Sequence, residues 1–193
     1  MNNFLITASG RSGTTFLSTV MNKSSIWSVK HEPQRSGKLS IAQIQKRFNQ
    51  NYYGEVNPFL WPIADEIKVK KKGVILRDPI ELWISIANRY QGKNLIQHLN
   101  DLEEIIFKML YYSMKKDKYL TISFKKMTND KNYLQAILSY FEVKDVKITE
   151  EILGEKINAS TRYDYYSLEQ FNNNIQSRVN NLKIKIKRCG KET

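Results

Sequence analysis

The sequence has few of the residues that build disulfides and metal sites. Its 193 residues include one cysteine, Cys189, and two histidines, His31 and His98, which lie far apart in the chain. A single cysteine excludes a disulfide within the chain and gives no sign of an oxidising compartment. These residues form no cluster with the spacing of a metal site, so we expect no metal cofactor.

Long apolar runs are also missing. No stretch approaches the roughly 20 apolar residues that a transmembrane helix needs, and no basic and apolar leader precedes the first expected strand. Hydrophobic residues still make up 41% of the chain, enough for a core. We therefore expect a cytoplasmic protein with one domain, residues 1–193, whose last residues, 182–193, form a basic tail.

Acidic residues are scarce relative to basic ones. There are 31 lysines and arginines against 19 acidic residues, which gives a net charge of +12. A basic surface suits an anionic partner such as a nucleotide, an acidic glycan, nucleic acid or a lipid head group. Scattered lysines also fit a bias towards solubility. The sequence has no RNA-binding signature, so we expect no specific nucleic-acid partner.

Short apolar runs alternate with helical stretches along the chain. This order predicts an α/β fold, a three-layer sandwich with a mostly parallel central sheet. Strands are expected at residues 3–9, 26–29, 69–76 and 119–124, and a strand or extended loop at 52–56. Helices are expected at residues 14–22, 39–49, 95–115 and 132–141, with one more that opens at Pro79 behind the cap Asp78. Ligands of such folds bind beyond the carboxyl ends of the strands.

A glycine-rich turn between the first strand and the first helix predicts an anion site. Residues 7–17 read TASGRSGTTFL and follow the apolar run at residues 4–6. Such a turn directs backbone N–H groups and the positive end of a helix at one point. Gly10 and Gly13 let the backbone approach the anion closely. The side chains that add donors are Arg11, Ser12, Thr14 and Thr15.

The turn departs from the common nucleotide-binding motifs. Ala8 stands where Gly-x-x-x-x-Gly-Lys-Ser/Thr has its first glycine, and Thr14 stands where it has its lysine. An ordinary kinase would lack its main γ-phosphate contact here, because the cation lies at Arg11. A P-loop small-molecule kinase or nucleotide-binding protein stays an alternative, with Asp78 in the place of a Walker-type aspartate.

A second anion contact is expected sixty residues later. Arg77 ends the strand expected at 69–76, and Ser85 follows eight residues on, which is about two helical turns. An arginine at a strand end and a hydroxyl on the next helix can bracket one anion from two sides.

Together these two blocks resemble the sulfotransferases that use 3′-phosphoadenosine 5′-phosphosulfate (PAPS) as donor. Residues 11–17 resemble the family's 5′-phosphosulfate loop, and Arg77-Asp78-Pro79 with Ser85 resembles its 3′-phosphate block. The resemblance covers roughly residues 3–141 as fold and favours glycan, tyrosyl and bacterial members over phenol-type ones. It implies sulfuryl transfer from PAPS to a hydroxyl or amine of a carbohydrate or peptide, without a metal. A homologue that binds the donor without turnover is a further alternative.

The resemblance also implies roles for single residues. Arg11 would contact the bridging oxygen and the transferred group, and Arg77 and Ser85 would hold the 3′-phosphate. The residues implied at the 5′ end of the donor are Gly10, Arg11, Ser12, Gly13, Thr14, Thr15 and Phe16, the last as an aromatic that stacks on adenine. Phe124 matches a family tyrosine poorly, and we expect it to pack in the core. Two late segments, residues 158–162 and 187–190, are weaker candidates for the site.

The general base is expected on the same rim as the loop. Glu32 is the first candidate, because glycan and tyrosyl members carry a catalytic glutamate after the second strand. His31 is the second, since it titrates near neutrality, and Glu55 is the third. Neighbours in a strand point opposite ways, so only one of His31 and Glu32 should face the sulfur. Trp27 and Trp61 are candidates for a sugar site, whereas Trp83 should pack in the core.

Overall fold

The computed structural model describes residues 1–33, 39–89 and 95–154, and four single residues beyond them, 177, 180, 181 and 184. The two late segments, residues 158–162 and 187–190, lie outside the described residues, as does Cys189. The described part contains the first strand, the glycine-rich turn and the second block, which include residues 10–16, Arg77 and Ser85 of the expected donor site.

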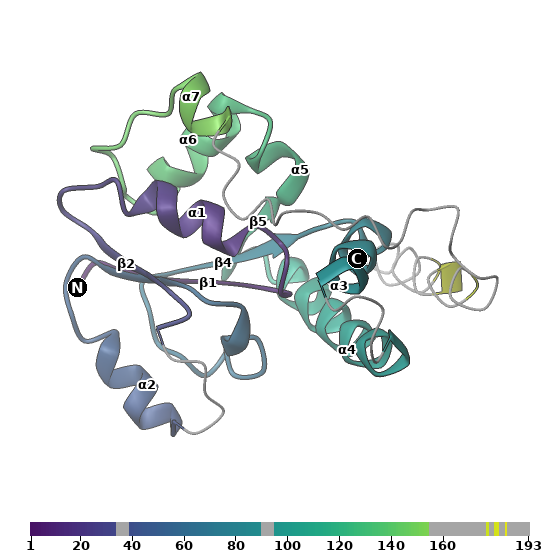
Figure 1. Ribbon diagram of the computed structural model, residues 1–193. Coiled ribbons are helices and arrows are strands. Elements are labelled where there is room, and N and C mark those ends of the chain that lie inside the picture. Colours follow the sequence, from purple (N-terminus) through teal and green to yellow (C-terminus); the bar gives the residue numbers. More distant parts are fainter. Residues whose placement is uncertain (34–38, 90–94, 155–176, 178–179, 182–183, 185–193) are drawn as a thin grey trace.

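A parallel sheet of five strands forms the centre of the molecule, in the order β2-β3-β1-β4-β5 (Figure 1). The strands are β1 (Asn3–Ala8), β2 (Ser28–His31), β3 (Tyr53–Val56), β4 (Lys71–Leu76) and β5 (Tyr119–Ser123). Every neighbouring pair is parallel, which confirms the expected α/β class. The strand expected at 26–29 begins later, because the backbone N–H groups of Ile26 and Trp27 bond to Oγ of Ser24 at 3.1 and 3.0 Å, in a turn.

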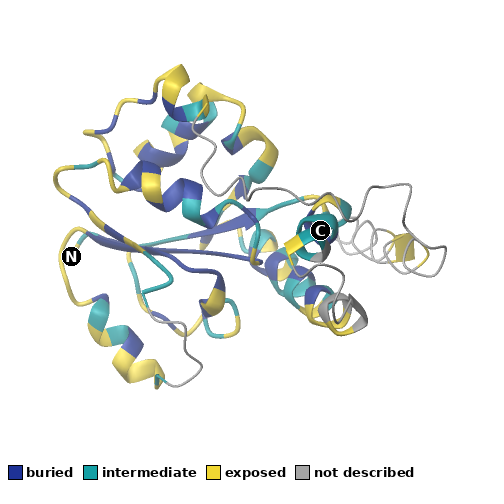
Figure 2. Ribbon diagram, viewed as in Figure 1, coloured by how far each residue is buried: buried dark blue, intermediate teal, exposed yellow. Residues whose placement is uncertain are grey.

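Helices cover both faces of the sheet and complete the three layers. One face carries α1 (Thr14–Met21), α5 (Phe124–Met127), α6 (Lys131–Tyr140) and α7 (Glu150–Gly154) (Figure 1). The other face carries α2 (Ile41–Arg47), α4 (Leu95–Met114) and the short 3₁₀ turn η1 (Pro58–Leu60), while α3 (Pro79–Arg89) packs against α4. All six residues of β1 are buried as a result (Figure 2).

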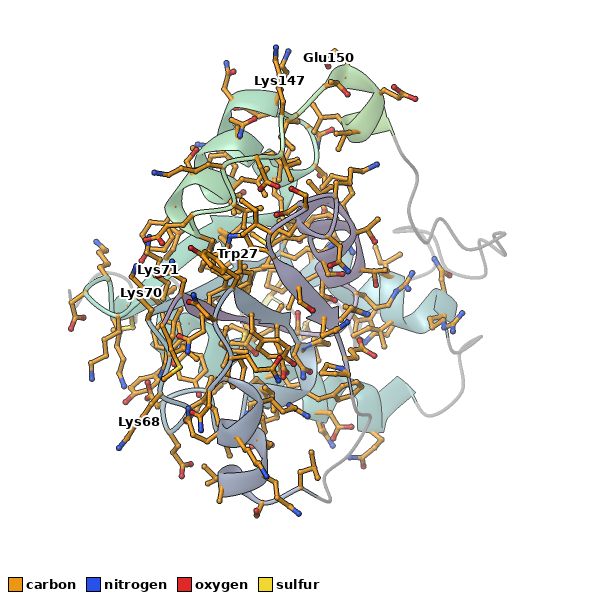
Figure 3. The ribbon with its side chains drawn as sticks, turned by 90° about the vertical axis from the view of Figure 1, so that its left-hand side faces the viewer. Trp27, Lys68, Lys70, Lys71, Lys147 and Glu150 are labelled. Atoms are coloured by element: carbon orange, nitrogen blue, oxygen red, sulfur yellow. The ribbon has the colours of Figure 1, made fainter. Side chains whose placement is uncertain are left out.

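The two ends of the strands carry different functional residues. All five strands begin at the end that faces the viewer in Figure 3, where Lys68, Lys70 and Lys71 stand around the start of β4. The strands end on the opposite side, near α3 (Figure 1). In a parallel sheet all turns that follow the strands gather at that carboxyl end, which therefore holds the glycine-rich turn and Arg77.

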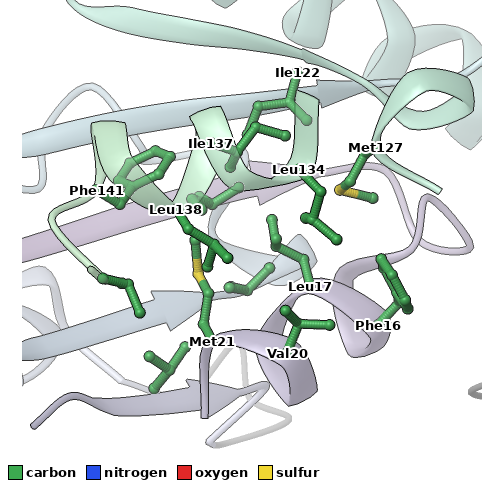
Figure 4. Close-up of a cluster of buried hydrophobic side chains, with 14 of the residues drawn as sticks. Phe16, Leu17, Val20, Met21, Ile122, Met127, Leu134, Ile137, Leu138 and Phe141 are labelled. Atoms are coloured by element: carbon green, nitrogen blue, oxygen red, sulfur yellow. The ribbon is translucent and has the colours of Figure 1, made fainter. Parts of the chain in front are cut away.

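Apolar side chains fill the space between the sheet and the helices. Leu17 and Met21 of α1 meet Leu134 and Leu138 of α6 over the sheet (Figure 4). Trp83 is buried in a separate cluster between α3 and α4, which confirms its expected place in the core. These clusters fix the helices against the sheet and so fix the turns at the carboxyl end.

Candidate functional site

The glycine-rich turn is held in a strained, left-handed backbone. Arg11 has φ 65° and Gly13 has φ 77°, and Gly13 stands directly before α1 as its cap residue. A Cβ at position 13 would lie 2.9 Å from Cε2 of Phe124, so both the conformation and the space require glycine. At Gly10 an added Cβ would meet no described atom within 4 Å, and the backbone there stays open to an approaching ligand.

The hydroxyls of the turn divide into two pairs with different partners. Oγ of Ser12 is buried and lies 2.6 Å from Oγ of Ser9, so this pair closes the turn from inside. Oγ1 atoms of Thr14 and Thr15, at the start of α1, lie 3.1 and 3.2 Å from Nε2 of His31. Thr14 is buried and Thr15 is partly exposed, so the two threonines are not equally accessible to a ligand at the turn.

The two blocks expected from the sequence are bonded to each other directly. Nη1 of Arg77 donates to the carbonyl oxygen of Arg11 at 2.5 Å. Nε of Arg11 donates to Oγ of Ser85 at 3.2 Å. The guanidinium carbon of Arg77 lies 4.3 Å above the ring of Phe124, in a cation–π contact. Phe124 also packs against the core cluster, as expected. No sequence pattern indicates that its ring contacts Arg77.

The cluster of Arg11, Arg77 and Ser85 concentrates positive charge. Burial lowers the pKa of Arg77 from its ordinary value, and Arg11 lowers it further, while Glu81 acts in the opposite direction. Both guanidiniums remain charged at neutral pH. Nε of Arg77 is buried and has no hydrogen-bond acceptor among the described residues, with Oε2 of Glu81 3.7 Å away. An anion placed here would accept the bond that this atom lacks.

The side chains of His31 and Glu32 contact each other, against the sequence expectation that they point opposite ways. Nε2 of His31 lies 3.3 Å from Oε1 of Glu32, and both side chains are about a quarter exposed, at 25% and 22%. The expected opposition was wrong because β2 ends at His31, and Glu32 has φ 47°, outside the extended region. Burial lowers the pKa of His31, which the charge of Glu32 only partly offsets.

Glu55 is not placed to act as a base, which corrects the third candidate. Its side chain is 0% exposed and contacts Arg47 at the end of α2. Its oxygens meet Nε and Nη2 of Arg47 at 2.8 and 3.1 Å. They also accept bonds from the hydroxyl of Tyr53 at 2.8 Å and the amide of Asn57 at 3.0 Å. A carboxylate with this set of donors links β3 to α2.

Two of the expected aromatic contacts lie in the core. Phe16 is 7% exposed and packs in the cluster between α1 and the sheet (Figure 4). Trp27 is buried against Phe4, with ring centroids 5.1 Å apart, so it offers no face to a sugar. Trp61, by contrast, lines a surface groove of about 450 Å³ together with Phe107 and Tyr111 of α4.

A cavity of about 480 Å³ opens beside Arg77 at the ends of β4 and β5. Leu82 and Met109 contribute to its apolar wall, and Lys126 and Tyr133 to its polar side. Sequence reasoning missed this space, because its wall combines residues of α3, α4 and α6 that share no motif. Its size and its mixed lining suit a nucleoside next to the cationic cluster.

Asp78 caps a helix in the structure, as expected. Its Oδ1 accepts bonds from the backbone N–H groups of Ile80 and Glu81 at 2.9 and 3.2 Å, at the start of α3. This use of the carboxylate weakens its comparison with a Walker-type aspartate.

The described residues contain no group of three or more metal-ligating side chains. None of the described helices combines the length and the apolar character of a transmembrane span.

Comparison with known proteins supports the fold. No protein-family model matches the sequence, and neither does any curated protein. Among solved structures, the chain is similar to the sulfotransferase domain of the olefin synthase from Synechococcus PCC 7002. The TM-score is 0.54 and the sequence identity 15%, over 91% of this chain and 82% of that one. The chain thus has a sulfotransferase-like α/β fold.

Proposed function

We propose that this protein is a sulfotransferase that moves a sulfuryl group from PAPS to a hydroxyl or amine of a carbohydrate or peptide. The observation that carries the proposal is the bonded cluster of Arg11, Arg77 and Ser85 beside the glycine-rich turn. Two guanidiniums close to a glycine-rich turn at the start of a helix suit a ligand with anionic groups at two positions. The donor PAPS carries a 5′-phosphosulfate and a 3′-phosphate.

The residues divide between the two ends of the donor. We assign the 5′-phosphosulfate to the backbone of the turn from Gly10 to Gly13, to Arg11, and to the hydroxyls of Thr14 and Thr15. We assign the 3′-phosphate to Arg77 and Ser85, and the adenosine to the cavity beside Arg77. Phe16 is left out of this donor site, because its burial accounts for it as a core residue.

Glu32 is our candidate for the base, with His31 as its positioning residue. Glu32 receives the proton of the acceptor while the acceptor oxygen bonds to sulfur and the sulfur–oxygen bond to the 5′-phosphate breaks. His31 contacts both Glu32 and the two threonine hydroxyls, so it links the base to the turn. Arg11 and the N–H groups of the turn stabilise the charge that develops on the leaving phosphate. PAPS supplies the activated sulfuryl group, and the product is 3′-phosphoadenosine 5′-phosphate (PAP).

Calorimetric titration with PAP and with ATP–Mg²⁺ tests the donor assignment. We expect PAP to bind, and Arg77→Ala to weaken it at least about tenfold, since hydrogen bonds to charged groups contribute about 1.5–3 kcal/mol. The exposed Lys125→Ala serves as a matched loss of one charge and should leave the affinity unchanged. Preference for ATP–Mg²⁺ would indicate a kinase instead. A screen of acceptors with labelled PAPS then separates an enzyme from a homologue that only binds the donor.

A further inference from the structure

The amino end of the sheet carries a lysine-rich surface that the proposed function does not use. We call it the lysine face. It consists of six lysines around the starts of β2 and β4 and the turn after α6: Lys23, Lys68, Lys70, Lys71, Lys144 and Lys147. Figure 3 looks onto this end of the molecule and labels four of them. The donor site lies at the opposite end of the strands.

Ion pairs and hydrogen bonds join the parts of the lysine face into one surface. Nζ of Lys70 and Nζ of Lys71 lie 3.0 and 2.9 Å from the same oxygen of Glu142, so β4 meets the turn after α6. The side chain of Asp145 accepts bonds from Ser24 and Ser25, which brings the segment before β2 to the same place. The six lysines therefore come from separate segments that touch one another.

The charge on this face is unbalanced. Two of its carboxylates are engaged: Glu142 is shared by Lys70 and Lys71, and Asp145 is engaged by two serines. These contacts hold the pKa of each carboxyl below its ordinary value. With the exposed Glu66 and Glu150, which lie within three residues of Lys68 and Lys147, the lysines of the face still outnumber its carboxylates, and the face is complementary to an anionic surface.

Apolar side chains project from the same surface. Ile26 is 56% exposed, and Tyr52 and Tyr140 are each 39% exposed. Tyr52 stacks edge-on against Trp27, at 5.6 Å between centroids, and the ammonium of Lys71 lies 5.1 Å from the ring centroid of Tyr140. Aliphatic and aromatic groups among lysines are the combination that the interface of a lipid bilayer accepts, apolar groups in the acyl boundary and ammonium groups at the head groups.

We propose that the lysine face docks this protein on an anionic lipid bilayer, with the donor site turned towards solvent. A soluble polyanion such as nucleic acid would be held by the ammonium groups, but it would leave Ile26 without a role. Docking at the amino end of the strands also leaves the carboxyl end open to a donor and an acceptor. The inference is independent of which reaction the site performs.

Co-sedimentation with vesicles tests the proposal. We expect binding to phosphatidylcholine vesicles that contain about one third phosphatidylserine, weak binding to phosphatidylcholine alone, and release by added salt. The variant Lys68→Glu/Lys144→Glu/Lys147→Glu should bind at least about 100-fold more weakly, since each lysine contributes roughly a factor of five. The control Lys30→Glu/Lys125→Glu/Lys131→Glu has the same net charge and changes exposed lysines elsewhere, so it should keep most of the binding.

A second variant separates the bilayer from a soluble polyanion. Ile26→Ser/Tyr140→Ser should weaken vesicle binding without affecting binding to polyphosphate, because only the bilayer takes up apolar groups. Unchanged vesicle binding in this variant would overturn the proposal, as would an equal loss in the two triple variants. Thermal midpoints by circular dichroism establish that each variant is folded before its binding is compared.

Discussion

The substitution Arg47→Ala probes the buried carboxylate at the carboxyl end of β3. Glu55 keeps two neutral donors, Tyr53 and Asn57, after the guanidinium is removed, but no opposite charge. Breaking a buried ion pair by removing one partner costs about 3–5 kcal/mol, because the remaining charge stays desolvated. We expect about 3 kcal/mol, the lower end, since the side chain of Arg47 is 19% exposed and the neutral donors remain.

Urea unfolding at neutral pH measures this loss, with Lys46→Ala as the control. Lys46 precedes Arg47 on α2 and is exposed, so its removal should change the free energy of unfolding by no more than about 0.5 kcal/mol. In the double variant Arg47→Met/Glu55→Leu, most of the loss should be recovered, because neither charge is left in the core. If the free energies of unfolding of Arg47→Ala and Lys46→Ala differ by less than about 1 kcal/mol, the reasoning about an uncompensated buried charge is refuted.

Two further predictions concern the turn and the histidine. Gly13→Ala should destabilise the fold by about 2–4 kcal/mol, from the left-handed backbone and the contact with Phe124; Gly10→Ala, which meets open space, is the matched control in the same thermal unfolding series. The lowered pKa of His31 means that the folded state resists protonation at this site, so stability falls as the pH drops below 6.5. His31→Gln should flatten this part of the profile of thermal midpoint against pH, and an unchanged slope would contradict the assignment.

The sequence predicted the architecture well because periodicity and turn chemistry are local signals. The strand before residue 10, the glycine at position 13 and the cap at Asp78 each follow from a short stretch of chain. Residues 52–56, which the sequence allows as a strand or an extended loop, contain β3 (Tyr53–Val56). Parallel order then places the ends of the strands together without any knowledge of side-chain contacts.

The contacts within the site could not be predicted in the same way. The placement of Glu32 depends on one left-handed φ angle, which no residue pattern signals at a glutamate. The inward direction of Glu55 depends on Arg47 from the helix before it. These errors share a physical origin, since strand alternation fixes which side a residue takes only while the strand continues and says nothing of its partners.

The bond between Arg77 and the backbone of Arg11 changes how the two anion contacts should be understood. The sequence places Arg11 and Arg77 66 residues apart and suggests independent anchors, one for each end of the donor. In the structure Nη1 of Arg77 holds the carbonyl of Arg11, whose φ of 65° shapes the turn. Under the proposed function, loss of Arg77 would therefore remove the contact assigned to the 3′-phosphate and also a support of the turn. Its effect should extend to the 5′ end of the donor, whereas loss of Ser85, which meets the side chain of Arg11, leaves that support in place.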